Sequence, residues 1–150
     1  MWSGVIVAFY VIPHVINHTF GLISYNVMEG MRLGMKAIWR PPIDELVLLL
    51  AFLTHFLLSL FALYRRSSLR VPLWETFQIG LGILIFPMIL IHVIGTAIAG
   101  QIIGFDTTYE YLISVLWITK PMRGTQQSLM LLIVWAHLWV GLHFWLRLKD

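Results

Sequence analysis

Four long apolar segments dominate this chain of 150 residues, at about residues 2–24, 46–64, 77–100 and 128–146. Each approaches or exceeds the roughly 20 mostly apolar residues that a helix needs to cross a bilayer. Hydrocarbon leaves no water to satisfy the backbone, so a spanning chain must form helices or a closed barrel. Runs of this length favour helices. We therefore predict an all-α integral membrane protein, with residues 1–150 forming a single transmembrane four-helix bundle.

The composition excludes several kinds of partner and cofactor for this chain. Hydrophobic residues make up 59% of the chain and charged residues 11%, and the mean hydropathy is +0.85. The net charge of +3 is explained by basic loops, so no nucleic-acid partner is expected. The absence of cysteine excludes cysteine-ligated iron–sulfur clusters and covalently attached c-type haem. No nucleophile–base pair, phosphate loop or carboxylate dyad is present, so no complete enzyme active site is expected in this chain.

The loops predict an orientation. The connector "YRRSSLRVP" carries Arg65, Arg66 and Arg70 without any acid, whereas the two longer loops mix both signs. Basic loops stay in the cytoplasm, so both termini are predicted to be cytoplasmic. Within the first long loop, "NVMEGMRLGMKAIW" is amphipathic enough for an interfacial helix, and Pro41-Pro42 should end it.

All the histidines lie in the predicted spans, and every span holds at least one. They are His14, His18, His55, His92, His137 and His143. An ionisable residue inside a membrane is costly and therefore indicates function. The alternative for any single ring is a hydrogen bond to a backbone carbonyl. Four helices that each carry a histidine disfavour that alternative.

Small residues lie about one or two helical turns from histidines in three spans, where they share a helix face with the ring. They are Ala51, Ser59 and Ala62 around His55, Gly95 and Ala99 after His92, and Gly141 after His137. Such residues leave room for a flat macrocycle, although they also permit close helix packing. No carboxylate or cysteine lies at membrane depth to complete a zinc site. Facing imidazoles in a bundle suit bis-histidine b-type haem, so four helices predict two haems.

The depth of each histidine in the membrane predicts which two histidines share a haem. His55 and His137 lie equally far from the cytoplasmic ends of their spans, so they should share an inner haem. An outer haem would then join His92 to His14 or to His18. Internal similarity favours this scheme, because "HVINHTFGLI" resembles "HVIGTAIAGQ" and "HFLLSLFALYRR" resembles "HLWVGLHFWLRL". The first two spans would correspond to the last two.

Two segments resemble the dihaem cytochrome b subunit of succinate dehydrogenases and fumarate reductases. In "SGVIVAFYVIPH" a glycine is followed ten residues later by His14, and "AHLWVGLHFWLR" begins its histidine pattern at His137. The resemblance implies that His14 and His137 are axial haem ligands, while His55 and His92 match by helix and depth. His18 is the alternative to His14, because Gly21 follows it as Gly95 follows His92. The histidine left over, with Asn17, would bond a haem propionate or a quinone carbonyl.

Three stretches resemble the membrane anchor of bacterial class III adenylate cyclases: "HVINHTFGLIS", "WETFQIGLGILIFPMILIHVIGT" and "VWAHLWVGLHFWLRLKD". This resemblance implies a dihaem cytochrome of the bacterial inner membrane that exchanges electrons with quinone and reports redox state to a cytoplasmic cyclase domain. The alternative is an electron-transfer anchor for flavin and iron–sulfur subunits. Related anchors continue into further spans, so this chain is expected to be a fragment or a free-standing cytochrome.

Other expectations concern packing and polar residues. A third class of function, a haem-free channel or assembly protein, predicts no haem absorbance. The apolar surfaces are compatible with membrane lipid and with a homodimer. The glutamines are expected to be solvated near helix ends; they are Gln78, Gln101, Gln126 and Gln127.

Overall fold

The computed structural model describes residues 2–68, 70–104 and 106–147. Of these residues 89% are helical and none lies in a strand. Four helical stretches are long and apolar enough to cross a membrane, at 2–22, 42–64, 73–103 and 121–147. The prediction of an all-α chain is confirmed, and the four stretches indicate a multi-pass membrane protein.

Three of the four stretches begin earlier than predicted, at Pro42, Leu73 and Pro121. Their first turns are polar or contain proline, so an apolar run does not include them. Proline is tolerated in a first turn because its missing N–H has no helical partner there. In the second stretch, Asp44 and Glu45 also lie in the first turn, where carboxylates interact favourably with the positive end of the helix dipole.

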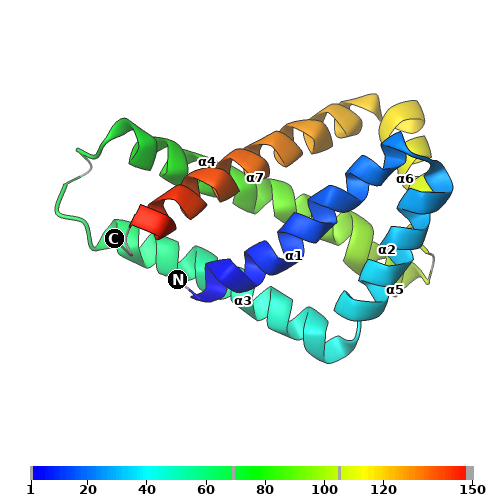
Figure 1. Cartoon of the computed structure of the whole chain (residues 1–150), viewed down its shortest axis with the longest axis horizontal. Helices are drawn as coiled ribbons and strands as arrows, with labels where there is room; N and C mark the ends of the chain where they lie inside the picture. The colour runs from blue at the N-terminus through cyan, green and yellow to red at the C-terminus, as the bar shows by residue number, and fades with distance from the viewer. Residues whose placement is uncertain (1, 69, 105, 148–150) are drawn as a thin grey trace. The chain divides into compact units, whose positions relative to one another are not determined.

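The chain divides into two compact units, Met1–Ser67 and Ser68–Asp150, and each contains two of the spanning stretches. The first unit consists of α1 (Trp2–Thr19), a 3₁₀ turn η1 (Phe20–Leu22), α2 (Tyr25–Trp39) and α3 (Pro42–Tyr64) (Figure 1). Its spanning helices α1 and α3 pack on each other. The prediction of a single transmembrane domain stays a prediction.

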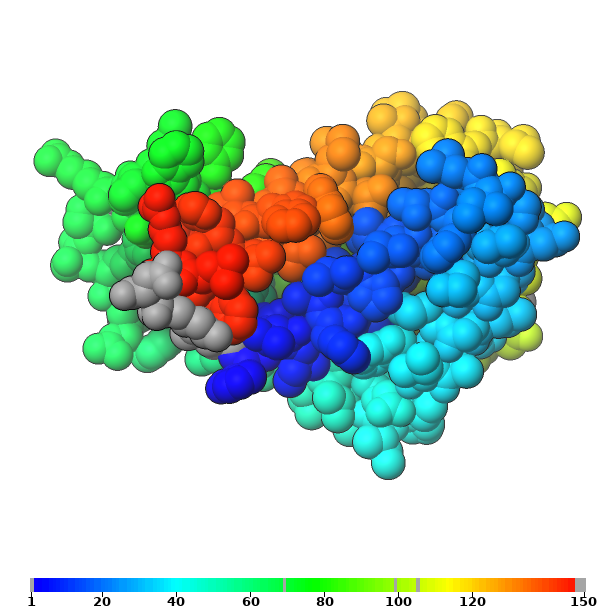
Figure 2. Space-filling model, in the orientation of Figure 1, coloured from blue at the N-terminus to red at the C-terminus, as the bar shows by residue number. Residues whose placement is uncertain are grey.

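The predicted amphipathic helix is α2, and one of its faces packs on α1. Ser24 caps it by accepting a hydrogen bond from the Val27 amide at 3.2 Å. A Cβ on Gly21 would lie 2.9 Å from the Met28 sulfur, and at the other end of α2 the Trp39 ring meets Phe9 and Tyr10 edge-on. Figure 2 shows α2 beside the C-terminal part of α1.

The second unit contains α4 (Leu73–Val93), a π-helical segment η2 (Ile94–Ile98), α5 (Ala99–Ile103), α6 (Tyr109–Ile113), a second π-helical segment η3 (Ser114–Thr119) and α7 (Pro121–Arg147). The first three form one continuous stretch that packs against α7. Gly104 ends α5 with φ +76°, a left-handed conformation that glycine adopts without steric cost. The π-helical segments were not predicted, because π-helices have no recognisable periodicity in apolar residues.

The turn between η3 and α7 depends on a glycine. A Cβ on Gly124 would lie 2.7 Å from the Leu116 carbonyl oxygen and 2.8 Å from the Trp117 ring. Gly124 is buried, and its own carbonyl accepts a hydrogen bond from Ser128 Oγ at 3.1 Å. The closest contact is to backbone, which cannot rotate away as a side chain can. This close approach positions the first turns of α7.

Apolar side chains cover the outside of the described helices. Among the residues whose burial the structure describes, four hydrophobic ones are buried, namely Met28, Ala51, Ile85 and Tyr109. Large residues such as Leu132 (67% exposed) and Phe9 (72% exposed) point outward. A water-soluble domain buries such side chains in a close-packed core. This surface is compatible with contact to membrane lipid.

Candidate haem-ligand site

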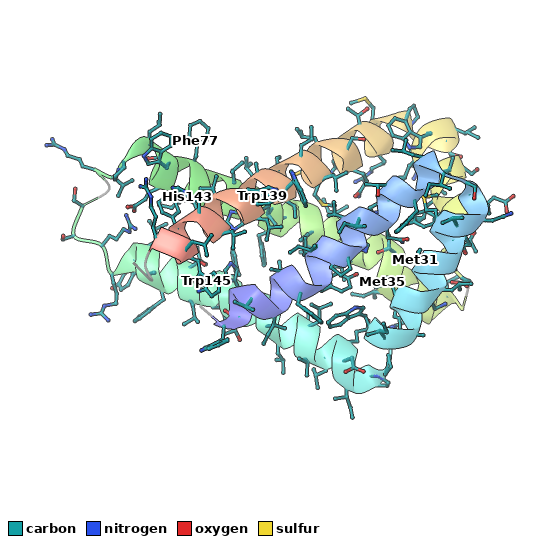
Figure 3. All side chains as sticks on the ribbon, in the orientation of Figure 1. Met31, Met35, Phe77, Trp139, His143 and Trp145 are labelled. Atoms are coloured by element: carbon teal, nitrogen blue, oxygen red, sulfur yellow. The ribbon has the colours of Figure 1, made fainter. Side chains whose placement is uncertain are left out.

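Each unit contributes histidines from both of its spanning helices. The first unit holds His14 and His18 on α1 and His55 on α3, and the second holds His92 on α4 with His137 and His143 on α7. His18 and His143 are exposed, whereas the other four are partly buried. Figure 3 shows His143 and Phe77 toward the same end of the α4–α7 pair. The four residues predicted as ligands are thus the more enclosed ones.

In the first unit, the His55 ring lies against the backbone of α1 at Gly4. A Cβ on Gly4 would lie 3.0 Å from His55 Cε1 and 3.1 Å from Nδ1. One turn along α3, Ser59 Oγ donates a hydrogen bond to the His55 carbonyl at 2.7 Å, and Ala51, one turn before His55, is buried. The glycine that makes room for His55 therefore comes from the neighbouring helix.

The second unit repeats this arrangement. A Cβ on Gly82 of α4 would lie 3.2 Å from Cε1 of His137 on α7. The repeat extends along the first helix of each unit, because Gly4 precedes His14 by ten residues and Gly82 precedes His92 by ten. The second spacing was not predicted, although "HVIN" and "HVIG" match in sequence and each follows a glycine by ten residues.

The surroundings of His14 and His18 differ. The His14 ring stacks on Tyr10 with a centroid distance of 5.2 Å and meets the His18 ring edge-on at 5.1 Å. Gly21, the residue that favoured His18, lies against the Met28 sulfur. Asn17, which lies between the two histidines in the sequence, is only 2% exposed. The small-residue argument for His18 is thereby weakened, since α2 occupies the space beside Gly21.

His92 is held by a glutamine from the facing helix. Its Nδ1 lies 3.1 Å from Gln127 Oε1 on α7. An amide oxygen only accepts, so His92 Nδ1 is the donor in this contact, which favours the tautomer with a lone pair on Nε2. This tautomer is the one that binds a metal through Nε2, with the other ring nitrogen donating to a carbonyl oxygen.

The π-helical segment η2 begins at Ile94, two residues after His92. Thr96 Oγ1 donates to the His92 carbonyl at 2.8 Å, and the buried Thr107 donates to the Thr96 carbonyl at 3.2 Å. A single turn of π-helix leaves carbonyl groups without regular partners and often occurs at functional sites. Here the two threonines satisfy such carbonyls, which fixes the backbone that carries His92.

His137 also faces a glutamine, Gln78 of α4. Gln78 Nε2 lies 3.4 Å from His137 Nε2, a long hydrogen bond. A Cβ on Gly141 would lie 3.0 Å from the same Gln78 nitrogen, so Gly141 leaves space for the amide. Gln78 Oε1 is buried and has no hydrogen-bond partner among the described residues. A buried acceptor left unpaired costs about 1–3 kcal/mol.

Gln78 and Gln127 therefore differ from the expectation that they are solvated. Both are only partly exposed, and each places its amide on a histidine ring of the facing helix. The sequence could not show this, because contacts across two helices depend on helix rotation. Since Gln78 donates and Gln127 accepts, both contacts favour the same tautomer, with the lone pair on the histidine Nε2.

Within each unit the predicted ligands His14 and His55, or His92 and His137, lie at two levels along the helices. His55 is level with Gly4 and His137 with Gly82, while His14 and His92 are ten residues further along their helices, about 15 Å at 1.5 Å per residue. Two ligands of one iron cannot be that far apart. The predicted pairs, His55 with His137 and His92 with His14 or His18, each draw one residue from either unit and stay predictions.

The chemistry of these histidines would suit a haem. Among the described residues, no three histidine, aspartate or glutamate side chains come together to hold a metal. A b-type haem brings four nitrogen ligands of its own and needs only two imidazoles from protein. Neutral imidazoles with an Nε2 lone pair and glycines that open space beside them meet that need. No family model, curated protein or solved structure matches this chain.

Proposed function

We propose that this chain is a dihaem b-type membrane cytochrome. His55 and His137 ligate one haem, and His92 and His14 ligate the other, with His18 as the alternative to His14. The observation that carries the proposal is the repeated arrangement in the two units. In each, a glycine of the first helix faces a histidine of the second, and another histidine follows that glycine ten residues later.

The repeat is compatible with the predicted pairs. Each unit contributes one proposed ligand that lies against a glycine of the neighbouring helix, and one that follows that glycine by ten residues. On this proposal, the residues in equivalent positions of the two units would ligate the same haem.

The residues around the ligands have defined tasks. When bound, haem supplies a one-electron redox couple whose potential depends on its axial ligands and surroundings. Gln127 holds His92 in the tautomer that binds iron, and Gly4 and Gly82 let the His55 and His137 rings approach the neighbouring backbone. The apolar helices limit access of water, which also tunes the potential.

The electron partner follows from the resemblances described above. Quinone dissolves in the same bilayer and would exchange electrons with the haems. A cytoplasmic adenylate cyclase domain would then respond to the redox state. Flavin and iron–sulfur subunits are the alternative partners. On this proposal the protein resides in the bacterial inner membrane, with both termini in the cytoplasm.

Separate alanine substitutions of His14 and His18 test the ligand choice. We expect His14→Ala to lower haem from about two to about one per chain, because His14 repeats the spacing of His92 from its glycine. His18→Ala should retain both haems. The measurement is pyridine haemochrome quantitation on purified protein, with His143→Ala as the control for an exposed histidine. Loss of haem from His18→Ala alone would transfer the ligand role to His18, and two haems in both variants would refute the outer pair.

A further inference from the structure

The side chain of Gln78 has no role in the function proposed above, yet it contacts His137, one of the proposed haem ligands. Its Nε2 is 3.4 Å from His137 Nε2, the nitrogen that the proposed haem iron requires. We propose that Gln78 is a displaceable cap on His137, which competes with haem iron for this nitrogen. The inference rests on the proposed function, and it adds a control over when the inner site is occupied.

The contact has the properties of a displaceable bond. At 3.4 Å it lies at the long end for a hydrogen bond that involves nitrogen. The oxygen of the same amide, Oε1, is buried and makes no hydrogen bond among the described residues, so it does not stabilise this position of the side chain. An amide that makes one long bond and leaves one buried atom unpaired can leave at low cost.

Glycine makes room for the amide on the α7 side. Gly141, one turn after His137, would bring a Cβ to 3.0 Å from Gln78 Nε2. On the α4 side, a Cβ on Gly82 would lie 3.2 Å from His137 Cε1. The Gln78 amide therefore lies against the His137 ring and against a position of α7 that carries no side chain.

Gln127 and Gln78 contact different nitrogens of their histidines. Gln127 bonds His92 through Nδ1 at 3.1 Å, so it stabilises that ring without covering Nε2. Gln78 covers Nε2 of His137 instead. Ligation at His92 is therefore compatible with its glutamine contact, whereas ligation at His137 requires the glutamine contact to break. Haem should consequently enter the His92 level more readily than the His137 level.

The test is titration of ferric haem b into the full-length haem-free protein in detergent, followed by absorbance. We expect two binding phases in the wild type and a tighter second phase in Gln78→Ala, by about tenfold, equivalent to about 1.4 kcal/mol. Gln78→Met keeps the side-chain volume without the amide and should tighten the same phase. Gln127→Leu, the matched control on α7, should weaken the other phase.

The outcomes separate the cap from simpler explanations. If Gln78→Ala tightens binding and Gln78→Met does not, space rather than the amide controls access, and the cap is refuted. Unchanged or weaker haem binding in both variants also refutes the cap. The proposed function would still stand in that case, provided that the wild type binds two haems. The effect must vanish in a His137→Ala background, since the cap acts only on that ring. Absence of haem binding in the wild type would instead refute the proposed function.

Discussion

Alanine substitution of His55 or of His137 is expected to remove one and the same haem. Each variant should retain about one haem per chain, and the double variant should retain as many as either single variant. The reason is the proposed pairing. Both residues lie against a glycine of the neighbouring helix in their own unit, and a haem that they ligate together would lose its site when either imidazole is removed.

Haem content and spectral type measure this result together. The pyridine haemochrome gives haem per chain, and reduced-minus-oxidised spectra report whether the remaining haem is still low-spin with two imidazoles. His143→Ala, on the exposed end of α7, is the control that should change neither. A double variant that has lost both haems would show that His55 and His137 serve different irons.

Substitution of Gly124 with alanine is expected to have the largest effect on stability. The added methyl group would meet the Leu116 carbonyl oxygen at 2.7 Å and the Trp117 ring at 2.8 Å. Overpacking of this kind lowers the free energy of unfolding by about 1–3 kcal/mol. We expect a value in the upper part of that range, because one of the contacted atoms belongs to the backbone and cannot rotate away. The turn from η3 into α7 would open, and Gln127 would shift with it.

Thermal unfolding in detergent, followed by circular dichroism, measures this effect. Gly80→Ala is the matched control, because Gly80 lies inside α4 with nothing within 4 Å of the position of its Cβ. There alanine should stabilise the helix by up to about 1 kcal/mol through its higher helix propensity. Equal midpoints for Gly124→Ala and Gly80→Ala would contradict the tight packing at η3.

The architecture could be predicted from sequence because its main signal is one-dimensional. An apolar run of sufficient length is a spanning helix wherever the remaining chain goes. The errors occurred where that signal fades, at the polar first turns before Leu46 and Ser128 and in the π-helical segments. The second long loop was predicted without α6 and η3, whose short helical turns give too few residues for a periodic pattern.

The candidate site was predictable only in part. Histidine in an apolar run is visible in the sequence, and so is the spacing from Gly82 to His92 once the spacing from Gly4 to His14 is known. The partners of the rings were not visible. Gln78 and Gln127 meet His137 and His92 across the α4–α7 interface, and such contacts depend on how the helices rotate and cross.

We expect this chain to hold two b-type haems between four histidines. Reduced-minus-oxidised absorbance of the purified protein, combined with haem quantitation, is the decisive measurement. We expect a Soret band, an α-band typical of low-spin bis-histidine haem, and about two haems per chain. A purified, helical protein without Soret absorbance after expression with sufficient haem would refute haem binding and favour a haem-free channel or assembly protein.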